Sequence, residues 1–130
     1  MLFTSLPVLE RIEAAAQAGF GGVEIQFPYT TPATQLRDAM QRARMPLVLF
    51  NLPAGDLLDG GAGLAGVPGR EQEFARALDQ ALAYVAIARP QRVNVLPGRW
   101  VDGVSQETAL STLHSNLRSR RMPFRRSVSR

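Results

Sequence analysis

Polar residues that could bind a small ligand occur within three apolar segments that have the character of β-strands. Glu24 alternates with apolar residues in "GVEIQF", Asn51 ends "LVLFN", and Asn94 interrupts "RVNVL". Burying a polar group costs free energy unless the group is hydrogen-bonded, so a strand face of this kind indicates a polar cleft. Glu24, Asn51 and Asn94 are therefore candidate substrate-binding residues. The alternative is that Glu24 pairs with an arginine and that the two asparagines only satisfy backbone groups.

Two more candidates, Asp56 and Arg70, lie in the long connection between the second apolar segment and the next helical pattern. This connection, residues 52–70, contains six glycines and two prolines, and connections of such length are usually either functional or disordered. Asp56 could hydrogen-bond a polyol or a hydroxy-oxo acid, and Arg70 could bind a carboxylate near a helix N-terminus. The alternative is that Asp56 caps a turn and that Arg70 pairs with Glu71 or Glu73.

The periodicity of the apolar residues predicts four helices that alternate with three strands. Strands are expected near residues 22–27, 46–51 and 92–96. Helices are expected from a Ser5 cap and Pro7 to Gly19, from Pro32 onward, from Phe74 to Val85, and from a Ser105 cap to Leu117. Strands that are separated by helices pair in parallel through right-handed crossovers.

Two α/β architectures fit this order: a doubly wound sheet and part of a (β/α)8 barrel. Three strands are few for an open sheet, and the first helix has no strand before it to pack against. The order therefore indicates an α/β protein cut at both ends, with exposed strand edges that favour self-association. In barrels the active site lies at the C-terminal ends of the strands, where polar residues such as Asn51 stand.

The composition is that of a single globular domain: 130 residues, of which 45% are hydrophobic and 20% charged. No apolar run approaches the roughly 18 residues that span a bilayer, and the first residues lack the basic region of a signal peptide. The chain has no cysteine, which excludes disulfides and thiolate metal sites. We therefore expect a cytoplasmic protein without a membrane partner.

The net charge of +4 belongs to the end of the chain. Residues 118–130 contain six arginines and no acid, whereas residues 1–117 contain nine arginines and eleven acids. The sequence thus divides into a mildly acidic body, residues 1–117, and a basic tail, residues 118–130. Such a tail could bind nucleic acid or another polyanion as the function of a non-catalytic module. Its composition is also typical of a disordered end, the interpretation that we favour over nucleic-acid binding.

Four motifs carry a family resemblance: "ERIEAAAQAGFGGVEIQFPY", "FNLPAGD", "GVPGREQEF" and "NVLPG". They resemble the N-terminal half of the hydroxypyruvate isomerase family, which belongs to the xylose isomerase-like TIM barrels. The resemblance extends from Met1 to about Arg118 and implies a partial (β/α)8 TIM barrel, with strands 2 to 4 and their flanking helices. It also implies that residues 52–70 are a loop at the mouth of the active site.

The resemblance implies a family reaction, the aldose–ketose type isomerisation of hydroxypyruvate to tartronate semialdehyde. The expected ligand is then a small hydroxy-oxo acid or a sugar-like molecule. The family's catalytic glutamates and its Mg²⁺ or Mn²⁺ site lie on later strands, and no position of this sequence matches them. We therefore assign no catalytic residue, metal ligand or cofactor to this chain and expect it to be inactive alone. A metal-ligand role for the single histidine, His114, is disfavoured, and the related endonuclease branch needs several histidines.

Overall fold

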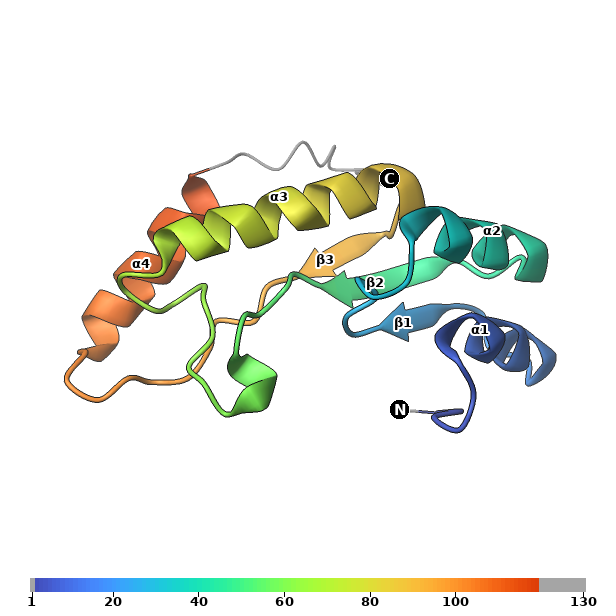
Figure 1. Ribbon diagram of the computed structural model, residues 1–130, viewed down its shortest axis with the longest axis horizontal. Coiled ribbons are helices and arrows are strands. Elements are labelled where there is room, and N and C mark those ends of the chain that lie inside the picture. Colours follow the sequence, from blue (N-terminus) through green and yellow to red (C-terminus); the bar gives the residue numbers. More distant parts are fainter. Residues whose placement is uncertain (1, 120–130) are drawn as a thin grey trace, which may run out of the picture.

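Three parallel strands and four α-helices alternate in the computed structural model, which describes residues 2–119 (Figure 1). The elements are α1 (Val8–Gln17), β1 (Val23–Ile25), α2 (Ala33–Ala43), β2 (Leu47–Asn51), the 3₁₀ turn η1 (Leu57–Asp59), α3 (Glu71–Ala88), β3 (Arg92–Asn94) and α4 (Gln106–Arg118). The strand order is β1-β2-β3, and both strand pairs are parallel. The predicted α/β class and parallel pairing are confirmed, whereas nearly all of the basic tail lies outside the described residues.

Helices cover one face of the sheet, and the core of that layer forms around the central strand β2. Phe50 of β2 is fully buried in one cluster with Ile12 of α1, Leu36 of α2 and Tyr84 of α3. Figure 1 shows α3 running along the sheet, with α2 beside its end. Of the strand residues in the opposite phase, Glu24 and Asn94 are exposed, Leu49 is half-buried and Asn51 is buried. The sheet therefore has one packed face and one open face.

The glycine-rich connection is folded and contributes to a second core. Leu52, Leu64 and Ala65 of this connection are buried in a cluster with Phe74 and Leu78 of α3. The connection contains η1 and runs near the loop that follows β3 (Figure 1). Burial of these apolar side chains makes the segment an ordered part of the fold.

Two predicted helix ends are confirmed and one predicted start is wrong. Gly19 follows α1 with a φ of 86°, and its N–H and that of the next residue donate to carbonyls of the last turn, as in a Schellman motif. Ser105 caps α4 by accepting a hydrogen bond from the N–H of Thr108 at 3.1 Å. Ser5 does not cap α1, because Pro7 occupies the N-cap position and sets the start of the helix.

The edge strands β1 and β3 are shorter than predicted, at three residues each. After β1 the chain turns at Pro28, whose carbonyl accepts the N–H of Thr31 at 2.9 Å. After β3 the carbonyl of Pro97 accepts an N–H from the glycine-rich connection. A strand ends where its backbone groups find partners outside the ladder, and these partners are not encoded in the apolar pattern.

Helices α2 and α3 are both followed by an arginine with left-handed backbone angles. Arg44 has a φ of 52° and Arg89 a φ of 50°. Glycine is the usual residue in such a position, because a Cβ there costs roughly 1–2 kcal/mol. The N–H of Met45 closes the first of these turns by donating to the carbonyl of Met40 at 3.0 Å. The two turns lead directly into the amino ends of β2 and β3.

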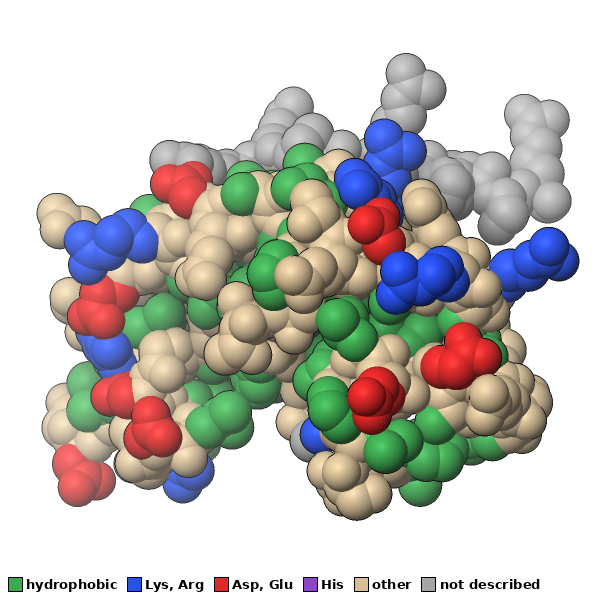
Figure 2. Space-filling model, turned by 45° about the vertical axis from the view of Figure 1, so that its right-hand side comes forward, with side chains coloured by type: hydrophobic (Ala, Val, Ile, Leu, Met, Phe, Trp, Pro, Cys, Tyr) green, Lys and Arg blue, Asp and Glu red, His purple; other side chains and the backbone are tan. Residues whose placement is uncertain are grey.

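The surface of the described residues mixes charges of both signs with apolar side chains. Figure 2 shows acidic and basic side chains interspersed on one face, which is hollowed along its lower edge. Leu2, Phe20 and Trp100 are among the large apolar side chains that are exposed. None of the helices within residues 2–119 has the length and apolar character to cross a membrane. Self-association and cytoplasmic localisation stay predictions.

Candidate functional site

The candidate site lies on the inner face of the sheet, by which we mean the face opposite Phe50. Successive strand residues point to opposite faces, so Asn51 faces away from the helices that surround Phe50. Asn51 pairs with Asn94 in the register of β2 and β3. Their side chains are joined, because Nδ2 of Asn94 donates to Oδ1 of Asn51 at 3.0 Å. The carboxyl ends of two strands therefore present one linked pair of amides.

Glu24 lies on the same face, one row nearer the amino ends of the strands. The register pairs Glu24 with Leu49, and Leu49 with Arg92. The predicted common face of Glu24, Asn51 and Asn94 is thereby confirmed. Glu24 takes part in none of the ion pairs formed among the described residues. Arg92 is a cation of this face that the sequence analysis missed, although its phase relative to Asn94 could have shown it.

The Asn51–Asn94 pair keeps hydrogen-bonding groups available for a ligand. Every buried side-chain nitrogen or oxygen among residues 2–119 has a partner. Nδ2 of Asn51 has no partner in this part of the chain, so it reaches solvent although Asn51 is only 7% exposed. Asn94 is exposed and retains its own carbonyl oxygen and one N–H. The pair can therefore donate to and accept from hydroxyl and oxo groups at the same time.

Tyr29 fixes the backbone beneath this pair. Its hydroxyl donates to the main-chain carbonyl of Asn51. The rings of Tyr29, Phe50 and Tyr84 meet edge to face, with centroids 5.3–5.9 Å apart. Burial raises the pKa of the Tyr29 hydroxyl above its ordinary value, with a further contribution from Tyr84, and burial raises the pKa of Tyr84 to about 12. Both hydroxyls act as donors to main-chain carbonyls, and the raised pKa values keep them protonated well into the alkaline range.

Arg70 and Asp56 form a clamp that closes the glycine-rich connection. Nη1 of Arg70 donates to Oδ1 of Asp56 and to the carbonyl of Gly63, both at 2.8 Å. The guanidinium also binds Glu73 through two hydrogen bonds, of 3.1 and 2.6 Å. The N–H of Gly63 completes the clamp by donating to Asp56 at 3.1 Å. This is the arrangement expected of a turn cap and a local ion pair.

The clamp leaves Arg70 little capacity for another anion. A guanidinium has five N–H donors, and four hydrogen bonds from Arg70 to protein groups are formed. Hydrogen bonding to Arg70 holds the pKa of Asp56 and of Glu73 below their usual values. Carboxylate binding by Arg70 stays a prediction, and it would depend on the one remaining N–H donor. The four hydrogen bonds that Arg70 does form stabilise the glycine-rich connection and the start of α3.

The glycine-rich connection is hydrogen-bonded to the loop that follows β3. The N–H of Gly66 donates to the carbonyl of Pro97, and the N–H of Arg99 donates to the carbonyl of Ala62, both at 2.8 Å. Gly98 lies between these bonds, and a Cβ there would be 2.3 Å from the carbonyl oxygen of Ala62. The loops after β2 and β3 therefore form one joined rim beside the Asn51–Asn94 pair.

A buried asparagine on α4 forms a hydrogen bond with the glycine-rich part of this rim. Asn116 is 5% exposed, and its Nδ2 donates to the carbonyl of Ala65 at 2.8 Å. Sequence reasoning missed Asn116, although it is a polar residue beside the apolar positions of α4. Because a buried carbonyl without a partner is costly, this contact stabilises the connection.

The described residues do not fit a divalent metal site. No group of three or more His, Cys, Asp or Glu side chains within them is placed to hold a metal ion. Glu24 is a single carboxylate on the inner face, and Asp56 is bound by Arg70. His114 is exposed on α4. Hard divalent cations require several oxygen ligands, which this part of the chain does not bring together.

Residues 12–119 match the model of the family described as "Xylose isomerase-like TIM barrel". The chain belongs to this family. Its three parallel strands are therefore part of a TIM barrel, as predicted. The inner face of the sheet corresponds to the barrel interior, and the Asn51–Asn94 pair stands at the end of the barrel where active sites are built.

The chain is similar to proteins that are called isomerases. It is 40% identical over 118 residues to hydroxypyruvate isomerase of Escherichia coli (strain K12). It is 38% identical over 118 residues to 2-oxo-tetronate isomerase of Haemophilus influenzae (strain ATCC 51907 / DSM 11121 / KW20 / Rd). Each match covers 91% of this chain and 46% of the relative, so the chain spans about half the length of these relatives.

A solved structure has the same arrangement of elements. It is a crystal structure of an AP endonuclease, family 2, from Brucella melitensis, with a TM-score of 0.81 and 36% sequence identity. The match covers 88% of this chain and 44% of that chain. Structural and sequence similarity therefore agree on the family and on the share of a barrel that this chain represents.

We predict that Gly98→Ala destabilises the protein more than Gly103→Ala. Both glycines have positive φ values, 101° and 79°, so alanine is strained at either position. A Cβ at Gly98 would also meet the carbonyl of Ala62, whereas a Cβ at Gly103 has nothing within 4 Å. Gly98→Ala should lower the free energy of unfolding by about 1–3 kcal/mol more than the control, measured by urea denaturation. Equal losses would show that the two loops do not meet at Gly98.

We predict that Arg70→Gln destabilises the protein more at neutral pH than in acid. Arg70 lowers the pKa of Asp56 and Glu73, so their stabilising contribution is fully present above the unfolded carboxylate values near about 4. It is lost as the pH falls through the lower folded values. The difference between the urea midpoints of wild type and variant should therefore shrink as the pH falls below the unfolded carboxylate values. Arg42→Gln on α2 is the control, and a difference that does not change with pH would contradict the clamp.

Proposed function

We propose that the chain supplies substrate-binding strand ends to an isomerase that acts on hydroxypyruvate or a similar hydroxy-oxo acid. The observation that carries this proposal is the Asn51–Asn94 amide pair at the carboxyl ends of two parallel barrel strands. The names of the relatives, hydroxypyruvate isomerase and 2-oxo-tetronate isomerase, supply the reaction class. Aldose–ketose type isomerisation is the reaction that we infer for the complete barrel.

The amide pair suits a ligand with neighbouring hydroxyl and oxo groups. Asn51 offers a donor, and Asn94 offers a donor and an acceptor, after their mutual hydrogen bond is counted. Tyr29 holds the backbone of Asn51, which limits the movement of this amide. Preorganised donors and acceptors reduce the cost of ordering the site on binding. In this proposal Asn51 and Asn94 contact the substrate, while Asp56 and Arg70 keep the neighbouring loop in place.

The reaction needs more than this pair provides. Moving a proton between adjacent carbons requires a base, and the enediolate oxygen that forms requires stabilisation. Glu24 is a lone carboxylate on the inner face, and the described residues do not fit a metal site. We therefore propose that the 130-residue chain binds substrate weakly and does not turn it over alone. The acid–base groups and any Mg²⁺ or Mn²⁺ would come from the remainder of a barrel.

Substrate binding is tested by titrating ¹⁵N-labelled protein with hydroxypyruvate and following the side-chain amide signals. We predict that the signals of Asn51 and Asn94 shift, because these amides face the ligand. The amide of Asn116 is an internal control, since it is buried against Ala65. Asn94→Ala should weaken binding about tenfold, the loss expected for roughly one hydrogen bond to a charged or strongly polar ligand. Shifts confined to other residues, or none at millimolar ligand, would remove the pair from the site.

Turnover is tested separately with a coupled isomerase assay that contains Mg²⁺ or Mn²⁺. We predict no turnover above the uncatalysed rate by the purified chain, because Glu24 is a lone carboxylate and the described residues bring no metal site beside it to stabilise the enediolate oxygen. Glu24→Gln is the matched variant. Turnover of about 1 s⁻¹ or more, in the ordinary enzymatic range, that is lost in Glu24→Gln would make Glu24 catalytic and would refute this part of the proposal. Binding without turnover agrees with both parts.

A further inference from the structure

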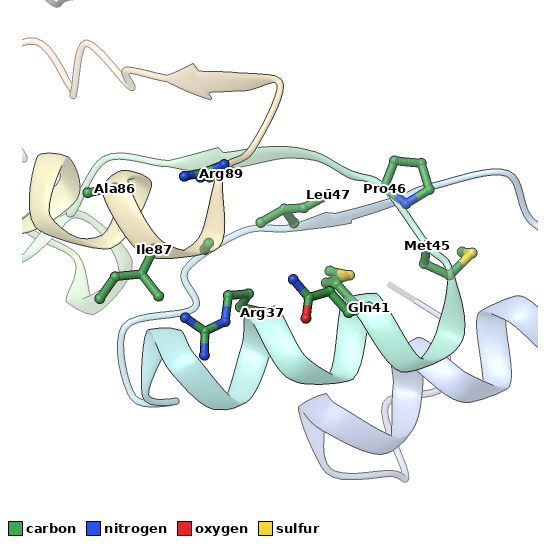
Figure 3. A pocket seen from close by; sticks show the side chains of 10 residues that line it. Arg37, Gln41, Met45, Pro46, Leu47, Ala86, Ile87 and Arg89 are labelled. Atoms are coloured by element: carbon green, nitrogen blue, oxygen red, sulfur yellow. The ribbon is translucent and has the colours of Figure 1, made fainter.

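A cavity lies at the amino end of β2, away from the candidate site. It has a volume of about 560 Å³ and is lined by residues from the end of α2, the start of β2 and the end of α3. Figure 3 shows Arg37 and Gln41 projecting from α2, with Leu47 of β2 beyond them and with Ile87 and Arg89 at the end of α3. We call this cavity the amino-end pocket. Its volume lies within the range of roughly 300–1,000 Å³ that is typical of small-molecule sites.

The amino-end pocket and the candidate site occupy opposite ends of the same strand. Leu47, the first residue of β2, lines the pocket, whereas Asn51, the last residue, belongs to the amide pair. No residue of the candidate site lines the pocket. A ligand of the pocket would therefore be separate from the substrate proposed above.

The pocket combines an apolar floor with a cationic rim. Met40, Met45 and Leu47 are buried and line its floor. The charged residues of the lining are Arg37 and Arg89, and no acidic residue lines the pocket. Its chemistry therefore favours a molecule with an apolar body and a negatively charged group.

The two guanidinium groups retain donors for an anion. Arg37 binds Asp38 through Nε and Nη2, both at 3.1 Å, which leaves its Nη1 group without a partner in the part of the chain that the structure describes. The side chain of Arg89 forms no hydrogen bond or ion pair with residues 2–119. The pocket thus carries more positive charge than the fold itself neutralises.

Arg89 also occupies a position that the backbone would favour for glycine. Its φ of 50° and ψ of 58° lie in the left-handed region. A residue with a Cβ is strained there, and such strain is found preferentially at functional positions. Arg44 has the same conformation outside the pocket, so what distinguishes Arg89 is that its side chain lines the pocket without a polar partner among residues 2–119.

We propose that the amino-end pocket binds an amphiphilic organic anion. Arg89 and Arg37 bind its carboxylate or phosphate group, and its apolar body lies against Met40, Met45 and Leu47. The carboxyl ends of α2 and α3 carry partial negative charge from their carbonyl groups, which by itself repels an anion. The affinity for the anion therefore depends on the two guanidinium groups rather than on the helix ends.

The test uses three ligands of equal chain length: octanoate, octyl phosphate and the neutral octanamide. Each is titrated into the 130-residue chain below its micellar concentration, and affinity is measured from ¹H–¹⁵N amide shifts. We expect shifts at Leu47, Ile87 and Arg89, with at least one anion binding about tenfold or more tightly than octanamide. The ratio between octanoate and octyl phosphate identifies the charged group that the site prefers. Equal affinity for octanamide, or no shift at these residues at millimolar ligand, overturns the proposal.

Two variants of Arg89 separate anion binding from stability. Arg89→Gln removes the charge, and Arg89→Gly removes the whole side chain while relieving the left-handed strain, so the glycine variant keeps or gains thermal stability. Both should lose about tenfold or more in affinity for the preferred anion. Arg42→Gln, on the exposed surface of α2 and outside the pocket, is the control. Unchanged anion affinity in both Arg89 variants, or an equal loss in the control, overturns the assignment of Arg89.

Discussion

The alternation of side chains at the carboxyl end of β2 separates the helix-covered core from the candidate site. Phe50 and Asn51 are neighbours in the sequence, yet Phe50 enters the core shared by three helices while Asn51 faces the barrel interior. Because β2 is the central strand, its register with both neighbours also decides what stands beside these residues. A shift of one residue would exchange the two faces and place an amide in the apolar core, which is strongly unfavourable. The amide pair of Asn51 and Asn94 is thus a consequence of core packing.

Polar contacts and buried apolar side chains together order the loops above the strand ends. The Arg70 clamp closes the connection on itself, and the bonds around Gly98 join it to the loop after β3. Glycine is needed at Gly98 because a backbone carbonyl passes where a Cβ would be. Asn116 ties the same rim to α4. Together with the apolar cluster beneath the glycine-rich connection, these contacts keep the loop ends beside the amide pair.

The two ends of β2 carry different chemistry. At the carboxyl end, neutral amides with free donors and acceptors suit a small polar ligand, which agrees with the isomerase names of the relatives. At the amino end, two arginines surround an apolar cavity between the ends of α2 and α3. One sheet carries both kinds of chemistry because its strands are parallel. The carboxyl ends of all strands lie at one edge of the sheet, and the amino ends lie at the opposite edge. A site at one end can therefore change without disturbing residues at the other.

The sequence by itself determined the α/β class, the parallel order, the barrel family, the Gly19 and Ser105 helix ends, and the common face of Glu24, Asn51 and Asn94. Periodicity and caps are local properties, so neighbouring residues are enough to encode them. Only the tertiary structure decided that Arg70 binds Asp56 and Glu73, that Tyr29 holds Asn51, and that β1 and β3 end after three residues each. It alone placed Arg37 and Arg89 around one cavity. These outcomes depend on which distant segments meet and compete for the same donors, and no local pattern records that competition.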